Sequence, residues 1–162
     1  MLRLPCRYMK DSPNRSPRRA APTHKEKSAV QRSVTALLDE LAPERVLRRI
    51  DHIPGPVEQH RSPNGCVLQA TGCAVSVSWF AEEASESSLG ELHVIVWSGT
   101  VARLGATRNK KGATIVTELI LHPIEPPAND CLWRATDGTQ YDTVSLAARC
   151  TALLQEQIGT AE

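Results

Sequence analysis

The stretch Glu91–Ile124 decides the fold. It reads ELHVIVWSGTVA over residues 91–102, RLGATRNKKG over residues 103–112 and ATIVTELILHPI over residues 113–124. Two long runs rich in branched apolar residues therefore flank a basic connector that contains glycines. Branched side chains favour strands, and glycine favours a reversal of the chain. The stretch predicts a β-hairpin at the centre of an antiparallel sheet.

The predicted hairpin has two different faces. A symmetric hairpin across residues 103–112 pairs His93 with His122 and Thr100 with Ile115. Because side chains alternate along a strand, one face is almost entirely apolar, includes Ile115, and forms the main core under a C-terminal helix. A shift of two residues in the pairing would keep both faces and separate the two histidines.

The opposite face of the hairpin is mixed in character. Such a face can line a binding site, where apolar walls surround a few polar groups that orient a ligand. Its tryptophan and glutamate could contact a ring or an amine, and its histidines could transfer a proton. The structural alternative is that the first helix half covers this face, or that the face forms a subunit interface. The candidate ligand-binding residues are His93, Trp97, Glu118 and His122.

No diagnostic motif assigns chemistry to these residues. The chain contains no GxSxG, SxxK or HExxH motif, so the sequence predicts no catalytic residue and no cofactor. A metal ion needs at least a third ligand beside two histidines. No HxH, HxxxH or CxxC spacing supplies that ligand, and no metal site is predicted. Whether the chain is an enzyme is left open.

The N-terminal segment differs from the rest of the chain in charge. Residues 1–27 contain eight Lys or Arg and two acidic residues, whereas residues 28–162 contain 11 basic and 16 acidic residues. The segment is rich in Pro, Arg and Ser and has little to bury, which predicts a disordered basic tail followed by a single α+β domain over residues 28–162. The sequence leaves open whether this tail is retained, is an organelle transit segment, or reflects a true start at Met9.

Two basic segments raise a nucleic-acid hypothesis. Two Ser-Pro repeats in the tail end in arginine, and the connector 103–112 holds four basic residues. Arginines of this kind can contact a phosphate backbone, although a solvated tail and a soluble hairpin tip are the alternatives. Aromatic content of 4% offers few platforms for base stacking. The candidate contacts are Arg15, Arg18, Arg19, Arg103, Arg108, Lys110 and Lys111.

Helices are predicted on both sides of the strands. The first begins at Ser28, whose spacing to Gln31 fits a capping box, and a second spans Pro43–Ile50. A C-terminal helix covers about residues 143–157, with Asp142 as N-cap and Gly159 at its end. The predicted fold class is α+β, with an N-terminal helix pair, a mostly antiparallel sheet of about five to six strands, and a C-terminal amphipathic helix packed on the sheet.

The cysteine pattern bears on the compartment. The chain has five cysteines, none in a CxxC pair and several inside apolar runs. This pattern is typical of buried, reduced thiols and predicts a cytoplasmic protein. No apolar run approaches the length needed to cross a membrane, and no membrane partner is predicted.

These observations lead to three functional hypotheses. The first is a small soluble non-catalytic binding protein that recognises a protein partner, or another copy of itself, through a sheet face or edge. The alternative is a small-molecule-binding or enzymatic domain that uses the face with His93, Trp97, Glu118 and His122. The second alternative is a nucleic-acid accessory protein that uses the basic tail and the 103–112 connector.

Overall fold

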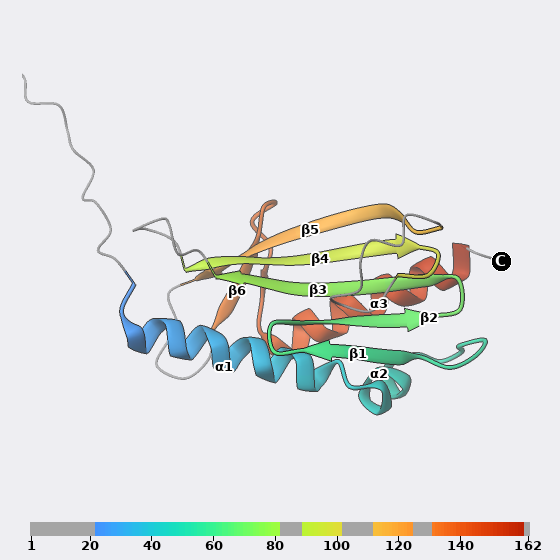
Figure 1. Cartoon of the computed structure of the whole chain (residues 1–162), viewed down its shortest axis with the longest axis horizontal. Coiled ribbons are helices and arrows are strands. Elements are labelled where there is room, and N and C mark those ends of the chain that lie inside the picture. The colour runs from blue at the N-terminus through green and yellow to red at the C-terminus, as the bar shows by residue number, and fades with distance from the viewer. Residues whose placement is uncertain (1–21, 82–88, 102–111, 125–130, 161–162) are drawn as a thin grey trace, which may run out of the picture.

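Seven antiparallel strands form one sheet in which each strand pairs with the next along the chain (Figure 1). The computed structural model describes residues 22–81, 89–101, 112–124 and 131–160. The strands are β1 (Glu58–Ser62), β2 (Gly65–Ala70), β3 (Cys73–Ala81), β4 (Gly90–Ser98), β5 (Thr114–Ile124), β6 (Leu132–Ala135) and β7 (Gln140–Tyr141). The chain is therefore α+β with an antiparallel sheet, and the described strands number seven rather than the predicted five to six.

Three helices accompany the sheet in the described residues: α1 (His24–Glu40), α2 (Pro43–Arg49) and α3 (Thr143–Thr160). The buried stripe of α3 packs with the alternate side chains of β3 and β4 in one hydrophobic core, and the buried stripe of α1 joins the same core. Figure 1 shows α3 behind the strands. We call the sheet face that packs against α1 and α3 the inner face, and the opposite face the outer face.

Alternation along β4 separates the two faces. Leu92, Val94 and Val96 are almost fully buried on the inner face. The residues between them, His93 and Ile95, are partly exposed on the outer face. The prediction of one core face and one mixed face is confirmed for this part of the hairpin. Because both α1 and α3 join the inner core, the prediction that the first helix half covers the mixed face is wrong.

The register of the central hairpin differs from the predicted one by two residues. His93 lies opposite Ile120, not His122, and Ile95 lies opposite Glu118. A β-bulge between Val96 and Trp97 then shifts the register again. A bulge places an extra residue on one strand and changes the facing of the residues beyond it.

The bulge changes the position of Ile115. This residue pairs with Trp97, and its side chain is 57% exposed instead of lying in the core opposite Thr100. The inner core therefore extends along β5 only as far as the partly buried Leu119. Beyond it, towards Thr114, the residues of β5 are exposed.

The first helix begins earlier than predicted. Thr23 is its N-cap and forms a capping box with Glu26, whereas the predicted box used Ser28 and Gln31. Thr23 Oγ1 accepts a hydrogen bond from the Glu26 amide, and a Glu26 carboxylate oxygen accepts one from the Thr23 amide. Both boxes have the same spacing, and the earlier one adds a turn to the helix. At the other end of the chain, α3 continues through Gly159 instead of ending there.

The buried thiols fit the prediction within the described residues. Cys66, Cys73, Cys131 and Cys150 are free and buried. Burial raises the pKa of the Cys66 thiol to about 11 and that of Cys131 to about 12. These thiols stay protonated and therefore unreactive at neutral pH. Cys6 and the predicted disordered tail up to residue 21 lie outside the described residues.

None of the helices in the described part of the chain is long and apolar enough to cross a membrane.

The N-cap of α3 gives a pH-dependent prediction. A carboxylate oxygen of Asp142 accepts a hydrogen bond from the Ser145 amide at 2.7 Å, and this bond holds the pKa of Asp142 below its usual range. The stabilisation is present above the ordinary carboxyl pKa of about 4 and is lost as the pH falls through the lowered value. We expect Asp142→Ala to lower the free energy of unfolding by about 1 kcal/mol at neutral pH. Urea unfolding should show that this deficit shrinks as the pH falls towards 3.

Asp142→Asn is the matched control for this prediction, because asparagine caps helices well and does not titrate. At neutral pH its stability should lie closer to that of the parent than to that of Asp142→Ala. A deficit of Asp142→Ala that stays constant from neutral to acid pH would show that the capping interaction does not depend on the charge.

Candidate functional site

The outer face brings two carboxylates onto one imidazole. His93 Nδ1 lies 3.1 Å from Glu118 Oε1, and His93 Nε2 lies 3.0 Å from Glu91 Oε2. The residues come from neighbouring strands, since Glu91 and His93 belong to β4 and Glu118 to β5. The side chain of His93 is 22% exposed, and both carboxylates are about twice as exposed. Two acidic side chains thus share one imidazole.

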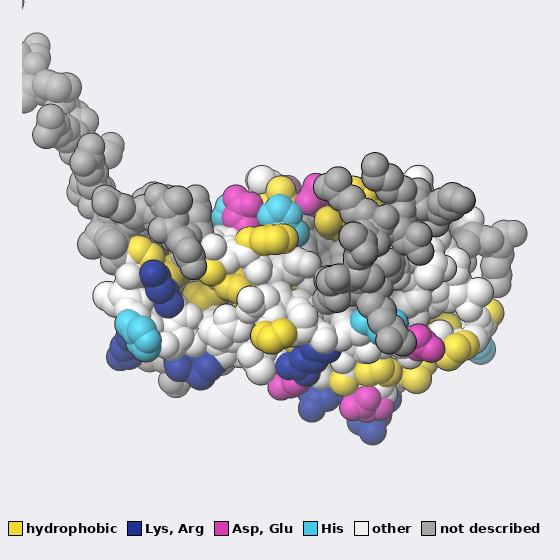
Figure 2. Space-filling model, in the orientation of Figure 1, with side chains coloured by type: hydrophobic (Ala, Val, Ile, Leu, Met, Phe, Trp, Pro, Cys, Tyr) yellow, Lys and Arg dark blue, Asp and Glu magenta, His cyan; other side chains and the backbone are white. Residues whose placement is uncertain are grey.

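His122 reaches the same group from the far side. Its Nε2 lies 4.0 Å from the second oxygen of Glu91, and its neighbour across the ladder on β6 is Arg134. The two predicted histidines are therefore linked through Glu91 instead of facing each other. We call the set Glu91, His93, Glu118 and His122 the outer-face cluster. Figure 2 shows histidine and acidic side chains beside apolar ones at this part of the sheet.

Aromatic side chains flank the outer-face cluster. The exposed ring of Phe80 packs edge-on against the His93 ring, with centroids 5.0 Å apart. Trp97 lies further along β4, and its indole N–H donates a hydrogen bond to Ser76 Oγ at 2.9 Å. Trp97 is thus held by β3 rather than by the cluster. Of the four predicted residues, His93 and Glu118 are in direct contact. His122 approaches Glu91, which also contacts His93. Trp97 lies separately, further along β4.

Sequence reasoning missed Glu91 and Phe80. Glu91 carried a usable signal, because residues two apart on a strand share a face and Glu91 precedes His93 by two. Phe80 carried none within its own strand, since its position beside His93 depends on the pairing of β3 with β4.

The outer-face cluster has acid–base groups without a preformed metal site. Its imidazole and carboxylates can hold and exchange protons, and they can attract a cation. Among the described residues, no group of three or more His, Cys, Asp or Glu is arranged to hold a metal ion.

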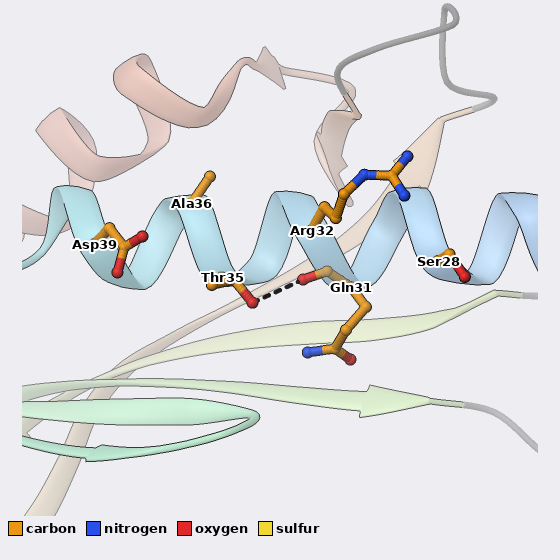
Figure 3. Close-up of a pocket in the computed structure, with 6 residues that line it drawn as sticks. All are labelled: Ser28, Gln31, Arg32, Thr35, Ala36 and Asp39. Atoms are coloured by element: carbon orange, nitrogen blue, oxygen red, sulfur yellow. Dashed lines mark hydrogen bonds between the residues drawn. The ribbon is translucent and has the colours of Figure 1, made fainter.

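Three surface depressions lined by described residues lie away from this cluster. One, of about 390 Å³, runs along the exposed face of α1 (Figure 3). Its lining residues all come from that helix, and Figure 3 shows the Thr35 hydroxyl bonded to the Gln31 carbonyl, so these groups partly satisfy each other. A second, of about 430 Å³, lies between Ile53 and the end of α3, and a third, of about 320 Å³, lies among the arginines of α2. None of the three includes a residue of the outer-face cluster.

One edge of the sheet is open within the described part of the chain. Strand β6 pairs with β5 only at residues 121–124, because β6 ends at Ala135, opposite Leu121, and the chain then turns to β7. In the seven-residue segment Thr114–Ile120, every residue except the bulge residue Val116 pairs with β4 on one side, and among the described residues the segment faces no strand on the other. We call this segment the free β5 edge.

The free β5 edge is apolar and accessible. It reads TIVTELI, with Glu118 as its one charged residue. Val116 is 51% exposed, and Ile115 is exposed to a similar extent. The opposite edge strand, β1, reads EQHRS and carries both charges and a histidine. Charged edge strands resist further pairing, whereas an apolar edge favours it.

Comparisons with protein-family models, with curated proteins and with solved structures found no match for this chain. Function must therefore be inferred from the residues themselves. All seven predicted nucleic-acid contacts lie outside the described residues, in the segments 1–21 and 102–111.

Proposed function

We propose that this chain is a non-catalytic protein-interaction module that binds an extended segment of a partner along the free β5 edge. In this mode, called β-strand addition, the backbone of the partner continues the hydrogen-bonded ladder. The observation that carries the proposal is the run Thr114–Ile120, which has a strand on one side only among the described residues.

The composition of the edge supports this function. Backbone N–H and C=O groups on an open edge are unpaired hydrogen-bonding groups that another strand can satisfy. The exposed side chains of Ile115 and Val116 add apolar area that a partner can bury. Their residue types also favour pairing, since branched side chains fit a pleated surface well.

The core fixes the geometry of this edge. Leu119 packs against the core from the inner face, and Leu121 is fully buried next to it. The bulge beside Val96 limits regular pairing near Val116. A bulge increases local twist and weakens indiscriminate edge-to-edge association. The edge is therefore anchored to the core at Leu119, and its ladder with β4 is interrupted nearer its start.

A peptide selection tests this proposal. Peptides selected from a random displayed library for binding to the full chain should protect the amides of residues 114–120 from hydrogen exchange. Val116→Lys should weaken the same peptides at least tenfold, because it places a charge in the contact. Methylation of the peptide backbone nitrogens should abolish binding, since strand addition depends on those donors.

Val144→Lys is the matched control. Val144 is exposed to a similar extent as Val116 but lies on α3, outside the free β5 edge. This variant should bind the selected peptides as the parent does. Selected peptides that protect amides elsewhere, or that tolerate Val116→Lys, would refute β-strand addition at this edge.

A small-molecule-binding or enzymatic role of the outer-face cluster is the second candidate function. It is favoured by the contact of His93 with two carboxylates and by the exposed Phe80 ring beside it. The two candidates differ in what a ligand perturbs. A small molecule bound at the cluster would shift the ring signals of His93 and His122 and leave the hydrogen exchange of residues 114–120 unchanged.

A further inference from the structure

We propose that the segment bound along the free β5 edge carries a Lys or Arg that faces Glu118, between apolar neighbours. This inference rests on the proposed strand addition and specifies the chemistry of the partner. It follows from the side chains that β5 presents on each face of the sheet at its open edge.

The outer face beside the edge is acidic. Glu118 is the outward-facing charged residue of the free β5 edge, and its carboxylate is 41% exposed. Glu91 adds a second carboxylate behind it, and the two share His93. In an antiparallel pair, directly opposite side chains have Cβ atoms about 5 Å apart. An added strand would therefore bring one outward side chain against Glu118.

Positive charge is scarce on the strands around Glu118. Among the described residues of β3, β4, β5 and β6, Arg134 is the one Lys or Arg. It pairs with His122, beyond the point where the free edge ends at Ile120. In the view of Figure 2 the Lys and Arg side chains lie along the α1 and α2 side of the molecule, away from the outer-face cluster. The edge itself thus lacks a Lys or Arg beside Glu118, whose contact on this face is the His93 imidazole.

The inner side of the edge favours apolar neighbours. Residues adjacent to Glu118 point to the opposite face, where Leu119 packs against the core. A bound strand would place the residues before and after its cation on this inner side. Apolar branched residues there would extend the core outwards, which stabilises the pairing.

Charge also argues against a second copy of this chain as the occupant. Two copies that pair antiparallel through the middle of the edge bring their Glu118 side chains opposite or diagonal to each other. Like charges in those positions destabilise a ladder. A charged residue on an edge strand is a known means of preventing self-association, so Glu118 both resists self-pairing and selects a cationic partner.

Three peptides test the inference on the full chain. In each, valine alternates with threonine so that valines flank the central residue, and the central residue is Lys, Gln or Glu. We expect the Lys peptide to bind about tenfold more tightly than the Glu peptide, with Gln between them, as measured by titration of amide shifts. In Glu118→Lys the order should reverse. Glu58→Lys is the matched control, because Glu58 is exposed on the opposite edge strand, and it should keep the parent order.

The outcomes separate this inference from the proposed function. Equal binding of all three peptides, with amides 114–120 protected, would overturn the charge preference and leave strand addition standing. No binding, or protection elsewhere, would overturn both. Light scattering measures the molar mass and tests the remaining outcome. If the chain is a dimer and Val116→Lys converts it to a monomer, a second copy occupies the edge and the proposal of a cationic partner is overturned.

Discussion

Replacing Gly90 with alanine is expected to destabilise the protein by roughly 4 kcal/mol, from backbone strain and overpacking together. Gly90 begins β4 with a φ of 132°, a conformation that side-chain-bearing residues rarely adopt. A Cβ atom there would lie 2.2 Å from the Phe80 carbonyl oxygen and 2.8 Å from Trp79 Cη2. The backbone of β3 and a buried indole would both have to move. Urea unfolding followed by circular dichroism measures the loss.

Gly138→Ala separates the two causes of this loss. Gly138 also has a positive φ, of 89°, but a Cβ atom added there would meet nothing within 4 Å. This variant should cost only the backbone term, about 1–2 kcal/mol. If Gly90→Ala and Gly138→Ala are equally stable, the close approach of β3 and β4 at Gly90 is relieved without cost and the expected overpacking is absent.

Gly90 also shows where sequence reasoning ended. No local pattern in the sequence indicates that a glycine lies against a tryptophan from another strand. The contact depends on the register of β3 with β4. The alternation of β4 and the Asp142 cap of α3 could be predicted from local signals, whereas the start of α1 and the contacts between distant segments could not.

The central hairpin illustrates the same limit. Alternation alone placed His93 and Glu118 on one face, because facing repeats every two residues whatever the register. It could not place His93 opposite Ile120, since a shift of two residues leaves the facing unchanged. The bulge at Val96 could not be read from the sequence either. Because of this bulge the Ile115 side chain is exposed, and it adds apolar area to the free β5 edge.

The free β5 edge arises from a mismatch of strand lengths. Strand β5 has 11 residues and β6 has four, so β6 covers only the end of β5 that packs over the core. The sequence does not show that β6 pairs at residues 121–124, and that pairing determines which part of β5 stays open.

Truncation of Trp133 is expected to cost about 3–5 kcal/mol, because it removes a large fully buried side chain from the strand that borders the free edge. Trp133 lies on β6 opposite Pro123 and Tyr141, and its ring packs edge-on against Trp79 with centroids 5.7 Å apart. Trp133→Ala leaves a cavity and loses that aromatic contact. The free energy of unfolding in urea measures the effect.

Trp133→Phe should cost far less, about 1 kcal/mol, for a reason specific to this site. The indole Nε1 of Trp133 is buried and has no hydrogen-bond partner among the described residues. A buried donor without a partner is itself destabilising by about 1–3 kcal/mol, and phenylalanine removes it. The smaller ring loses packing, and the removed N–H offsets part of that loss.

Val144→Ala is the control for these two variants. At an exposed position on α3, it should change stability by less than about 0.5 kcal/mol. A Trp133→Phe variant as unstable as Trp133→Ala would contradict this prediction, because removing the unpartnered indole N–H would then offset none of the lost packing.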